Sequence, residues 1–184
     1  MVDVVFINGT VGSGKTAAAE ALSVIEAEQG HPHALIDCDT IRGLWPPPAG
    51  DPFQHELELE NVRDLAANYR RAGAQHLIVA GVIEVAAEVA RYVTAFGAQR
   101  MLVCRLTADP SVLEARLIRR HEGDAAARQW HLHRAGELAD ILEAAEIDDV
   151  TIDTTTRPPR QVAEMIAATA EWTVASGSRD SQIV

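Results

Sequence analysis

The feature that most constrains this chain is a run of glycines followed by a lysine near the amino end. Residues 9–16 read Gly-Thr-Val-Gly-Ser-Gly-Lys-Thr and fit the pattern G-x-x-x-x-G-K-[ST] without a mismatch. Glycine lets the backbone approach a bound anion closely, and the free N–H groups at a helix start attract negative charge. An apolar run, Val4–Ile7, precedes the loop, and a helical pattern follows it. The segment is therefore predicted to be a phosphate-binding loop, or P-loop.

Each part of this loop has an expected task in binding ATP and Mg²⁺. Backbone N–H groups wrap the phosphates, Lys15 reaches the outer phosphates, and the Thr16 hydroxyl binds Mg²⁺. Fifteen of the sixteen basic residues are arginine, so the only lysine of the chain stands inside the motif, which argues against a chance match. The residues of the loop expected to bind the nucleotide are Gly9, Val11, Gly12, Ser13, Gly14, Lys15 and Thr16.

Strands and helices are expected to alternate along the whole chain. Short apolar runs between turn residues predict strands, and longer segments with a helical apolar period predict helices. The expected strands are residues 2–7, 33–36, 75–80, 99–106 and 149–152, and the expected helices are residues 15–29, 56–72, 83–96, 110–121, 125–145 and 159–174. Such alternation predicts an α/β fold in which helices cover both faces of a parallel sheet.

Length and charge bound the class of protein. A chain of 184 residues fits one domain, expected over residues 1–175, with a flexible tail at residues 176–184. The net charge of -11 argues against nucleic acid as a partner, because nucleic-acid binding needs a basic surface. Two cysteines and no long apolar run predict a cytoplasmic protein that does not enter a membrane. The sequence fits a monomer or a homodimer.

Two further observations narrow the class of P-loop protein. GTPases recognise guanine with an Asn-Lys-x-Asp motif, which the chain cannot contain because Lys15 is its only lysine. Motor and transport ATPases place a carboxylate at the end of an apolar strand, whereas the apolar strand at 76–80 runs into Gly81. We therefore expect an ATP-dependent phosphotransferase acting on a small molecule. The alternative is a regulatory nucleotide-binding NTPase without such an acceptor.

Three short segments beyond the P-loop resemble known kinases. Residues 36–42, Ile-Asp-Cys-Asp-Thr-Ile-Arg, resemble the D-G-D-N-x-R segment of adenylylsulfate kinases, and residues 60–63, Glu-Asn-Val-Arg, resemble their E-N-x-R segment. Residues 151–155 are similar to the last strand of these enzymes and of chloramphenicol phosphotransferase-like enzymes. The resemblance to this P-loop small-molecule kinase superfamily implies a three-layer α/β/α P-loop NTPase fold with five parallel strands in the order 2-3-1-4-5. It also implies a substrate cap at about residues 40–56 and a lid at about residues 121–128.

Two carboxylates are candidates for the chemistry. Asp37 and Asp39 follow the second expected strand, and the carboxyl ends of parallel strands are where such sheets bind ligands. Along an extended chain the two side chains would point the same way, with Cys38 opposite. We expect Asp37 to be the general base and to help hold Mg²⁺, and Asp39 to contact the acceptor. The alternative is an aspartate that only caps the following turn.

Arginine and amide side chains are candidates for binding both substrates. The resemblance implies that Arg42 and Asn61 contact the acceptor and that Arg157 lies beside the adenine. Arg116 and Arg120 lie on the helix that leads into the expected lid. An arginine placed there neutralises charge on the transferring phosphoryl group, and Arg116 is also expected to contact the nucleotide.

One departure from the resemblance concerns the acceptor. Adenylylsulfate kinases have an arginine three positions before the asparagine that corresponds to Asn61, and this chain has Glu58 there. Glu56 and Glu84 are expected to border the same pocket. Because an anion there repels an anionic substrate, we expect a neutral or cationic hydroxyl compound, such as a nucleoside, sugar or antibiotic, rather than adenylylsulfate. The alternative is that Glu58 faces solvent and carries no information about the acceptor.

Overall fold

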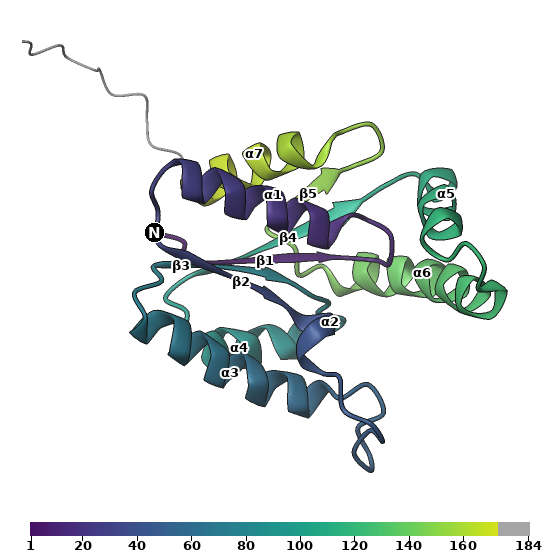
Figure 1. Ribbon diagram of the computed structural model, residues 1–184, viewed down its shortest axis with the longest axis horizontal. Helices are drawn as coiled ribbons and strands as arrows, with labels where there is room; N and C mark the ends of the chain where they lie inside the picture. The colour runs from purple at the N-terminus through teal and green to yellow at the C-terminus, as the bar shows by residue number, and fades with distance from the viewer. Residues whose placement is uncertain (173–184) are drawn as a thin grey trace, which may run out of the picture.

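Five parallel strands form the centre of the molecule (Figure 1). The computed structural model describes residues 1–172. The strands lie in the order β2-β3-β1-β4-β5, which confirms the expected sheet order. Their bounds are β1 (Val4–Gly9), β2 (His33–Asp37), β3 (His76–Ala80), β4 (Met101–Thr107) and β5 (Val150–Asp153). All neighbouring strands pair in parallel, so their carboxyl ends meet at one edge of the sheet.

Helices cover both faces of the sheet and extend beyond its carboxyl edge. In Figure 1, α1 and α7 lie above the sheet, and α3 and α4 lie below it. The helix α5, its following turn and α6 stand at the carboxyl edge. The bounds are α1 (Lys15–Glu28), α3 (His55–Arg71), α4 (Ala86–Phe96), α5 (Pro110–Arg120), α6 (Ala125–Ala145) and α7 (Pro159–Ala170). None of the helices within residues 1–172 is both long and apolar enough to cross a membrane.

The central strand β1 supplies side chains to two separate cores. Val5 and Ile7 belong to the cluster under α1 and α7, whereas Val4 and Phe6 belong to the cluster under α3 and α4. Successive side chains of a strand point to opposite faces, so a strand buried on both faces must be apolar at every position. This requirement explains the uninterrupted apolar run before the P-loop.

Several of the expected boundaries differ from those of the structure. A short helix, α2 (Cys38–Ile41), follows β2 directly, where an extended chain was expected. The helix expected from residue 83 begins at Ala86, because the Asn8 side chain bonds both backbone groups of Ile83. The helix expected over residues 125–145 is confirmed as α6, which the Asp124 side chain caps, so the expected lid at residues 121–128 spans a turn and the first residues of this helix. The expected tail at residues 176–184 lies outside the described residues.

We predict that Gly81→Ala destabilises the fold. A Cβ atom at this position would lie 2.7 Å from the Phe6 ring and 2.9 Å from the Cys38 sulfur. Overpacking of this kind costs about 1–3 kcal/mol. Chemical denaturation should report the loss as a lower transition midpoint.

Gly136→Ala is the matched control, since Gly136 lies exposed inside α6 with open space around it. It should stabilise the helix by about 0.5–1 kcal/mol. Equal stability of the two variants would contradict the packing at Gly81.

Candidate active site

The P-loop stands at the carboxyl edge of β1, and its shape depends on glycine. Gly9 has φ 142°, and a Cβ atom there would lie 2.6 Å from the Leu106 carbonyl oxygen of β4. Gly14, with φ 98°, is the last residue before α1, which begins at Lys15. Positive φ angles let the loop turn its N–H groups inward, and the helix start adds its own free N–H groups. This cradle fits a phosphate chain.

The Lys15 ammonium lies across the loop. Its Nζ donates to the Gly9 carbonyl at 2.9 Å and to the Thr10 carbonyl at 3.2 Å. Burial lowers the pKa of Lys15 to about 8, although the carboxylates of Asp39 and Asp37 act in the opposite direction. A charge held by two carbonyl oxygens in a desolvated site gains strongly from an arriving phosphate.

The Thr16 hydroxyl and the Asp37 carboxylate form the link between α1 and β2. Thr16 Oγ1 donates to Asp37 Oδ2 at 2.9 Å, and the Asp39 N–H donates to Asp37 Oδ1 at 3.0 Å. Asp37 therefore caps α2 and also reaches the P-loop. A hydroxyl and a carboxylate oxygen are hard donors of the kind that Mg²⁺ prefers, so these two residues fit that ion.

Asp39 does not lie on an extended chain, so the reason for expecting its side chain to point the same way as that of Asp37 was wrong. Because α2 begins at Cys38, Asp39 lies on a helical turn and not on a strand, and alternation does not apply. Asp39 instead pairs with Arg42, three residues further along. Both Asp37 and Asp39 still act on the charge of Lys15, so the fold brings the two carboxylates to the P-loop.

Arg42 and Asn61 lie together next to α2. The Asn61 amide donates to the Ile41 carbonyl at 2.5 Å and so fixes the end of α2. Arg42 forms ion pairs with Asp39 and, at 3.1 Å, with Glu58. Its guanidinium is thus held between two carboxylates at the start of the expected cap.

Glu58 does not face solvent, because only 1% of its surface is exposed. It accepts a hydrogen bond of 2.5 Å from the Tyr92 hydroxyl and pairs with Arg42. Burial raises the pKa of Glu58, while Tyr92 and Arg42 act against this rise. The residue is an internal partner of the cap arginine, a role for which the sequence carried no signal beyond the unexpected glutamate.

A cavity of about 440 Å³ opens on the other side of the P-loop, between α1, α5 and α7. Its walls combine apolar side chains with arginines, which suits a flat heterocycle joined to phosphates. The lining residues are Gly12, Ser13, Gly14, Ala17, Ala18, Arg116, Leu117, Arg119, Arg120, Thr154, Arg157, Pro159 and Val162.

Arg116 ties the P-loop to the segment after β5. Its guanidinium donates to the Gly12 carbonyl at 3.2 Å, and to the hydroxyl and carbonyl of Thr154 at 3.0 and 2.7 Å. The Thr154 hydroxyl in turn donates to the Ser13 carbonyl at 2.9 Å. Thr154 is a site residue that was not expected from the sequence, although it lies in the segment that resembles the last strand of known kinases. With its donors used in this way, Arg116 shapes the loop.

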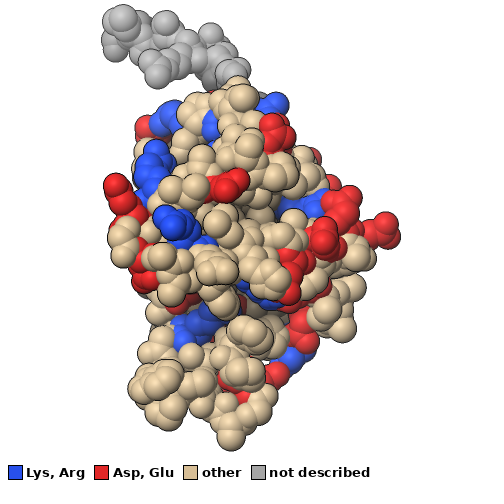
Figure 2. Space-filling model, turned by 90° about the vertical axis from the view of Figure 1, so that its right-hand side faces the viewer, with Lys and Arg blue, Asp and Glu red and all other residues tan. Residues whose placement is uncertain are grey.

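Arg120 and Arg157 also line the cavity but differ in their partners. Arg157 donates to the Asp153 carbonyl at 2.6 Å. No ion pair holds Arg120 within residues 1–172, and its charge contributes to the lowered pKa of Lys15. Arg120 lines the same cavity as Gly12, Ser13 and Gly14 of the P-loop. Figure 2 looks onto this edge of the molecule, where acidic and basic side chains lie interspersed.

Comparison with known proteins gives both a family and a fold. The family model described as adenylylsulphate kinase matches residues 1–108. No curated protein sequence matches the chain. A tunicamycin resistance protein of Deinococcus radiodurans is similar in structure, with 24% identity, a TM-score of 0.64 and coverage of 96% of this chain and 100% of that one.

Two further solved structures share the fold. One is an APS kinase of Mycobacterium tuberculosis in complex with AMPPNP and APS, with 20% identity, a TM-score of 0.62 and coverage of 92% and 97%. The other is a shikimate kinase of Acinetobacter baumannii in complex with shikimate, with 16% identity, a TM-score of 0.62 and coverage of 95% and 97%. Together with the sheet order, these likenesses confirm the P-loop kinase fold that the sequence predicted.

We predict that nucleotide affinity falls as the pH rises through 8. Lys15 has a pKa of about 8 in the free protein, and phosphate binding needs its ammonium form. Below this pKa the Lys15 ammonium is already present and attracts the phosphates in full. Above it, Lys15 must take up a proton each time a nucleotide binds. Affinity for a non-hydrolysable ATP analogue should drop about fivefold between pH 8 and pH 9. Calorimetry in two buffers of different ionisation enthalpy should detect the proton uptake, and a flat affinity from pH 7 to 9 would contradict it.

Proposed function

The chain belongs to the adenylylsulphate kinase family, and we propose that it transfers the γ-phosphate of ATP to a hydroxyl group of a small molecule. The observation that carries this proposal is the contact between the Thr16 hydroxyl and the Asp37 carboxylate at the P-loop. It supports a site in which a nucleotide-binding loop and a candidate base lie side by side. Thr16 and Asp37 would hold Mg²⁺, which supplies charge neutralisation on the β- and γ-phosphates.

In the proposed reaction, the acceptor hydroxyl attacks the γ-phosphorus in line with the bond to the leaving ADP. Asp37 takes the proton of that hydroxyl as the new oxygen–phosphorus bond forms and the bond to the β-phosphate oxygen breaks. Lys15 follows the charge on the outer phosphates, and Arg120 neutralises the transferring group. Asp39 is held on the acceptor side by its ion pair with Arg42. This ion pair favours Asp37, rather than Asp39, as the base.

The nucleotide side of the site follows from the cavity between α1, α5 and α7. We place the adenine there, with Arg157 at its rim. Arg116 positions the P-loop through Gly12 and Thr154 rather than acting on the transferring group. Of the two arginines expected to be catalytic, Arg120 keeps that role in the proposed function and Arg116 does not.

The charge balance on the acceptor side supports a neutral or cationic acceptor. Three arginines around the cap, Arg42, Arg91 and Arg134, each form ion pairs with two carboxylates, which leaves an excess of negative charge. An anionic acceptor would need at least one cation whose charge is not already balanced. Arg42 pairs with Asp39 and Glu58, Arg91 pairs with Glu56 and Glu88, and Arg134 pairs with Glu84 and Glu137.

We predict that Asp37→Asn keeps ATP binding and reduces turnover by about a hundredfold or more, the usual scale for a general acid–base group. The change keeps the shape of the side chain and removes its charge. Release of ADP should be followed with an acceptor found by thermal-shift screening in the presence of an ATP analogue and Mg²⁺.

Asp39→Asn is the matched control for this experiment, because Asp39 is the neighbouring carboxylate that lies on α2. It should change the KM for the acceptor more than kcat. The opposite result, with kcat lost in Asp39→Asn and kept in Asp37→Asn, would reverse the assignment of the base.

We also predict that adenylylsulfate is a poor acceptor. Turnover with ATP and Mg²⁺ should stay below about one per second, the lower end for cognate kinase substrates. Glu58→Gln removes one of the two anions that balance Arg42, so it should raise the affinity for adenylylsulfate. Glu60→Gln, an exposed change on the same helix, should leave this affinity unchanged. Fast turnover of adenylylsulfate by the unaltered protein would refute the charge argument.

A further inference from the structure

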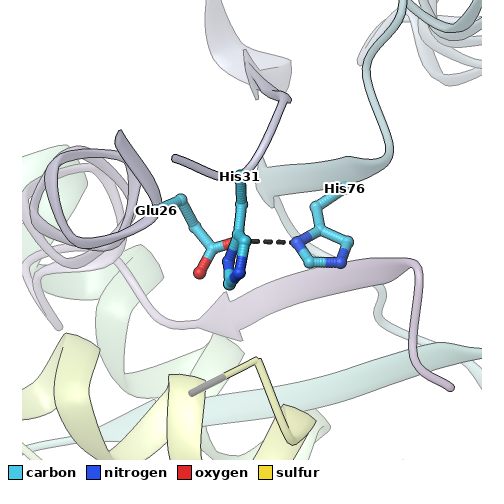
Figure 3. A group of neighbouring side chains, drawn as sticks. All are labelled: Glu26, His31 and His76. Carbon is cyan, nitrogen blue, oxygen red and sulfur yellow. Dashed lines mark hydrogen bonds and ion pairs between the residues drawn. The ribbon is translucent and has the colours of Figure 1, made fainter. Parts of the chain in front are cut away.

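Two histidines and a glutamate lie close together near the C-terminal end of α1 (Figure 3). Glu26 lies in the last turn of α1, His31 follows that helix, and His76 is the first residue of β3. The P-loop stands at the other end of α1, at the carboxyl edge of the sheet. The cluster therefore belongs to neither side of the proposed kinase site.

Both imidazole rings lie within hydrogen-bonding distance of the same carboxylate oxygen of Glu26. His76 Nδ1 lies 2.5 Å and His31 Nδ1 lies 3.2 Å from Glu26 Oε2. These three atoms all lie within 4.8 Å of one another. Ligands bound to one tetrahedral Zn²⁺ at about 2.0–2.1 Å lie about 3.3 Å apart. The cluster thus needs only small side-chain movements to surround one ion.

Glu26 is fully buried, which makes its charge costly. Its second oxygen, Oε1, has no hydrogen-bond partner among residues 1–172, and no arginine or lysine of that part of the chain pairs with it. A buried carboxylate needs a cation or a full set of donors to offset the loss of water. Both imidazoles approach the same oxygen, Oε2, so Oε1 is left without a partner among the described residues.

The backbone holds the three residues in position. The His31 N–H donates to the Glu26 carbonyl at 2.9 Å, in a turn made possible by Gly30 with φ 74°. The His76 N–H donates to the Pro32 carbonyl at 3.2 Å, which joins β3 to the same turn. Metal sites need ligands whose orientation is fixed by their surroundings, and these bonds provide part of that support.

Packing of His76 supplies a second constraint. Its ring stacks on the Trp172 indole with centroids 4.2 Å apart and planes 2° apart, and the indole N–H donates to the Val2 carbonyl at 2.8 Å. The His31 side chain is 24% exposed, the His76 side chain is 11% exposed, and the Glu26 side chain is fully buried. The cluster is closed on one side and open to solvent beside His31, which gives an ion a path of entry.

We propose that Glu26, His31 and His76 form a Zn²⁺ site with two nitrogen ligands and one oxygen ligand. The fourth position faces the solvent beside His31, where water completes the tetrahedron. Imidazole nitrogen favours Zn²⁺ over Mg²⁺ or Ca²⁺, which take oxygen donors. Zn²⁺ binding here ties the end of α1 to the start of β3 and neutralises the buried carboxylate.

The test is a titration of the full chain with Zn²⁺ after treatment with a chelator, in the presence of excess Mg²⁺ to occupy the P-loop side. Calorimetry should show one Zn²⁺ per chain, and Zn²⁺ should raise the melting temperature. His31→Gln and Glu26→Gln should each weaken this binding by about tenfold or more, the scale seen even for changes around metal ligands. No nucleotide is involved, so the result is independent of the proposed kinase activity.

His133→Gln is the matched control, because His133 lies exposed on α6 and pairs with Glu137 at 3.2 Å. It should bind Zn²⁺ as the unaltered protein does. Co²⁺ in place of Zn²⁺ should give visible absorption that His31→Gln lacks, and circular dichroism of each variant establishes that it is folded. Absence of bound Zn²⁺ in the unaltered chain, or equal binding by folded His31→Gln, would overturn the proposal.

Discussion

The P-loop is the point at which four distant segments of the chain are hydrogen-bonded together, two through its backbone and two through its threonine side chains. Thr16, at the start of α1, bonds the end of β2, and Arg116 of α5 bonds Gly12. Thr154, after β5, bonds Ser13, and the Thr10 hydroxyl donates to the Ala135 carbonyl of α6 at 2.8 Å. A loop of glycines has little conformational preference of its own, so these contacts are what hold it open for a phosphate chain.

The P-loop also divides the site into halves of different electrostatic character. The half proposed to bind the nucleotide carries arginines such as Arg120, which has no ion pair within residues 1–172. The acceptor half contains arginines whose charge is already balanced by carboxylates, and Glu58 is the buried member of that set. In the proposed function, this difference would let the protein attract a triphosphate on one side without attracting a second anion on the other, although its overall charge is -11.

The strands and the P-loop could be predicted because each rests on local patterns, whereas the strand order followed from the resemblance to known kinases. Apolar runs such as Val4–Ile7 and the glycine spacing are visible without tertiary contacts. The short helix α2 was missed, since its four residues show no period and its cap, Asp37, reads equally well as an active-site carboxylate. The roles of Glu58 and Arg116 depend on partners 34 and 38 residues away, Tyr92 and Thr154, and no sequence period indicates such contacts.

The presence of a single lysine in the chain has a practical consequence for chemical labelling. Apart from the terminal amine, Lys15 carries the only amine in the sequence. An acylating reagent therefore meets a single side-chain target, and that target stands where the outer phosphates of a nucleotide would cover it. The extent of labelling would therefore measure the fraction of molecules whose phosphate site is empty.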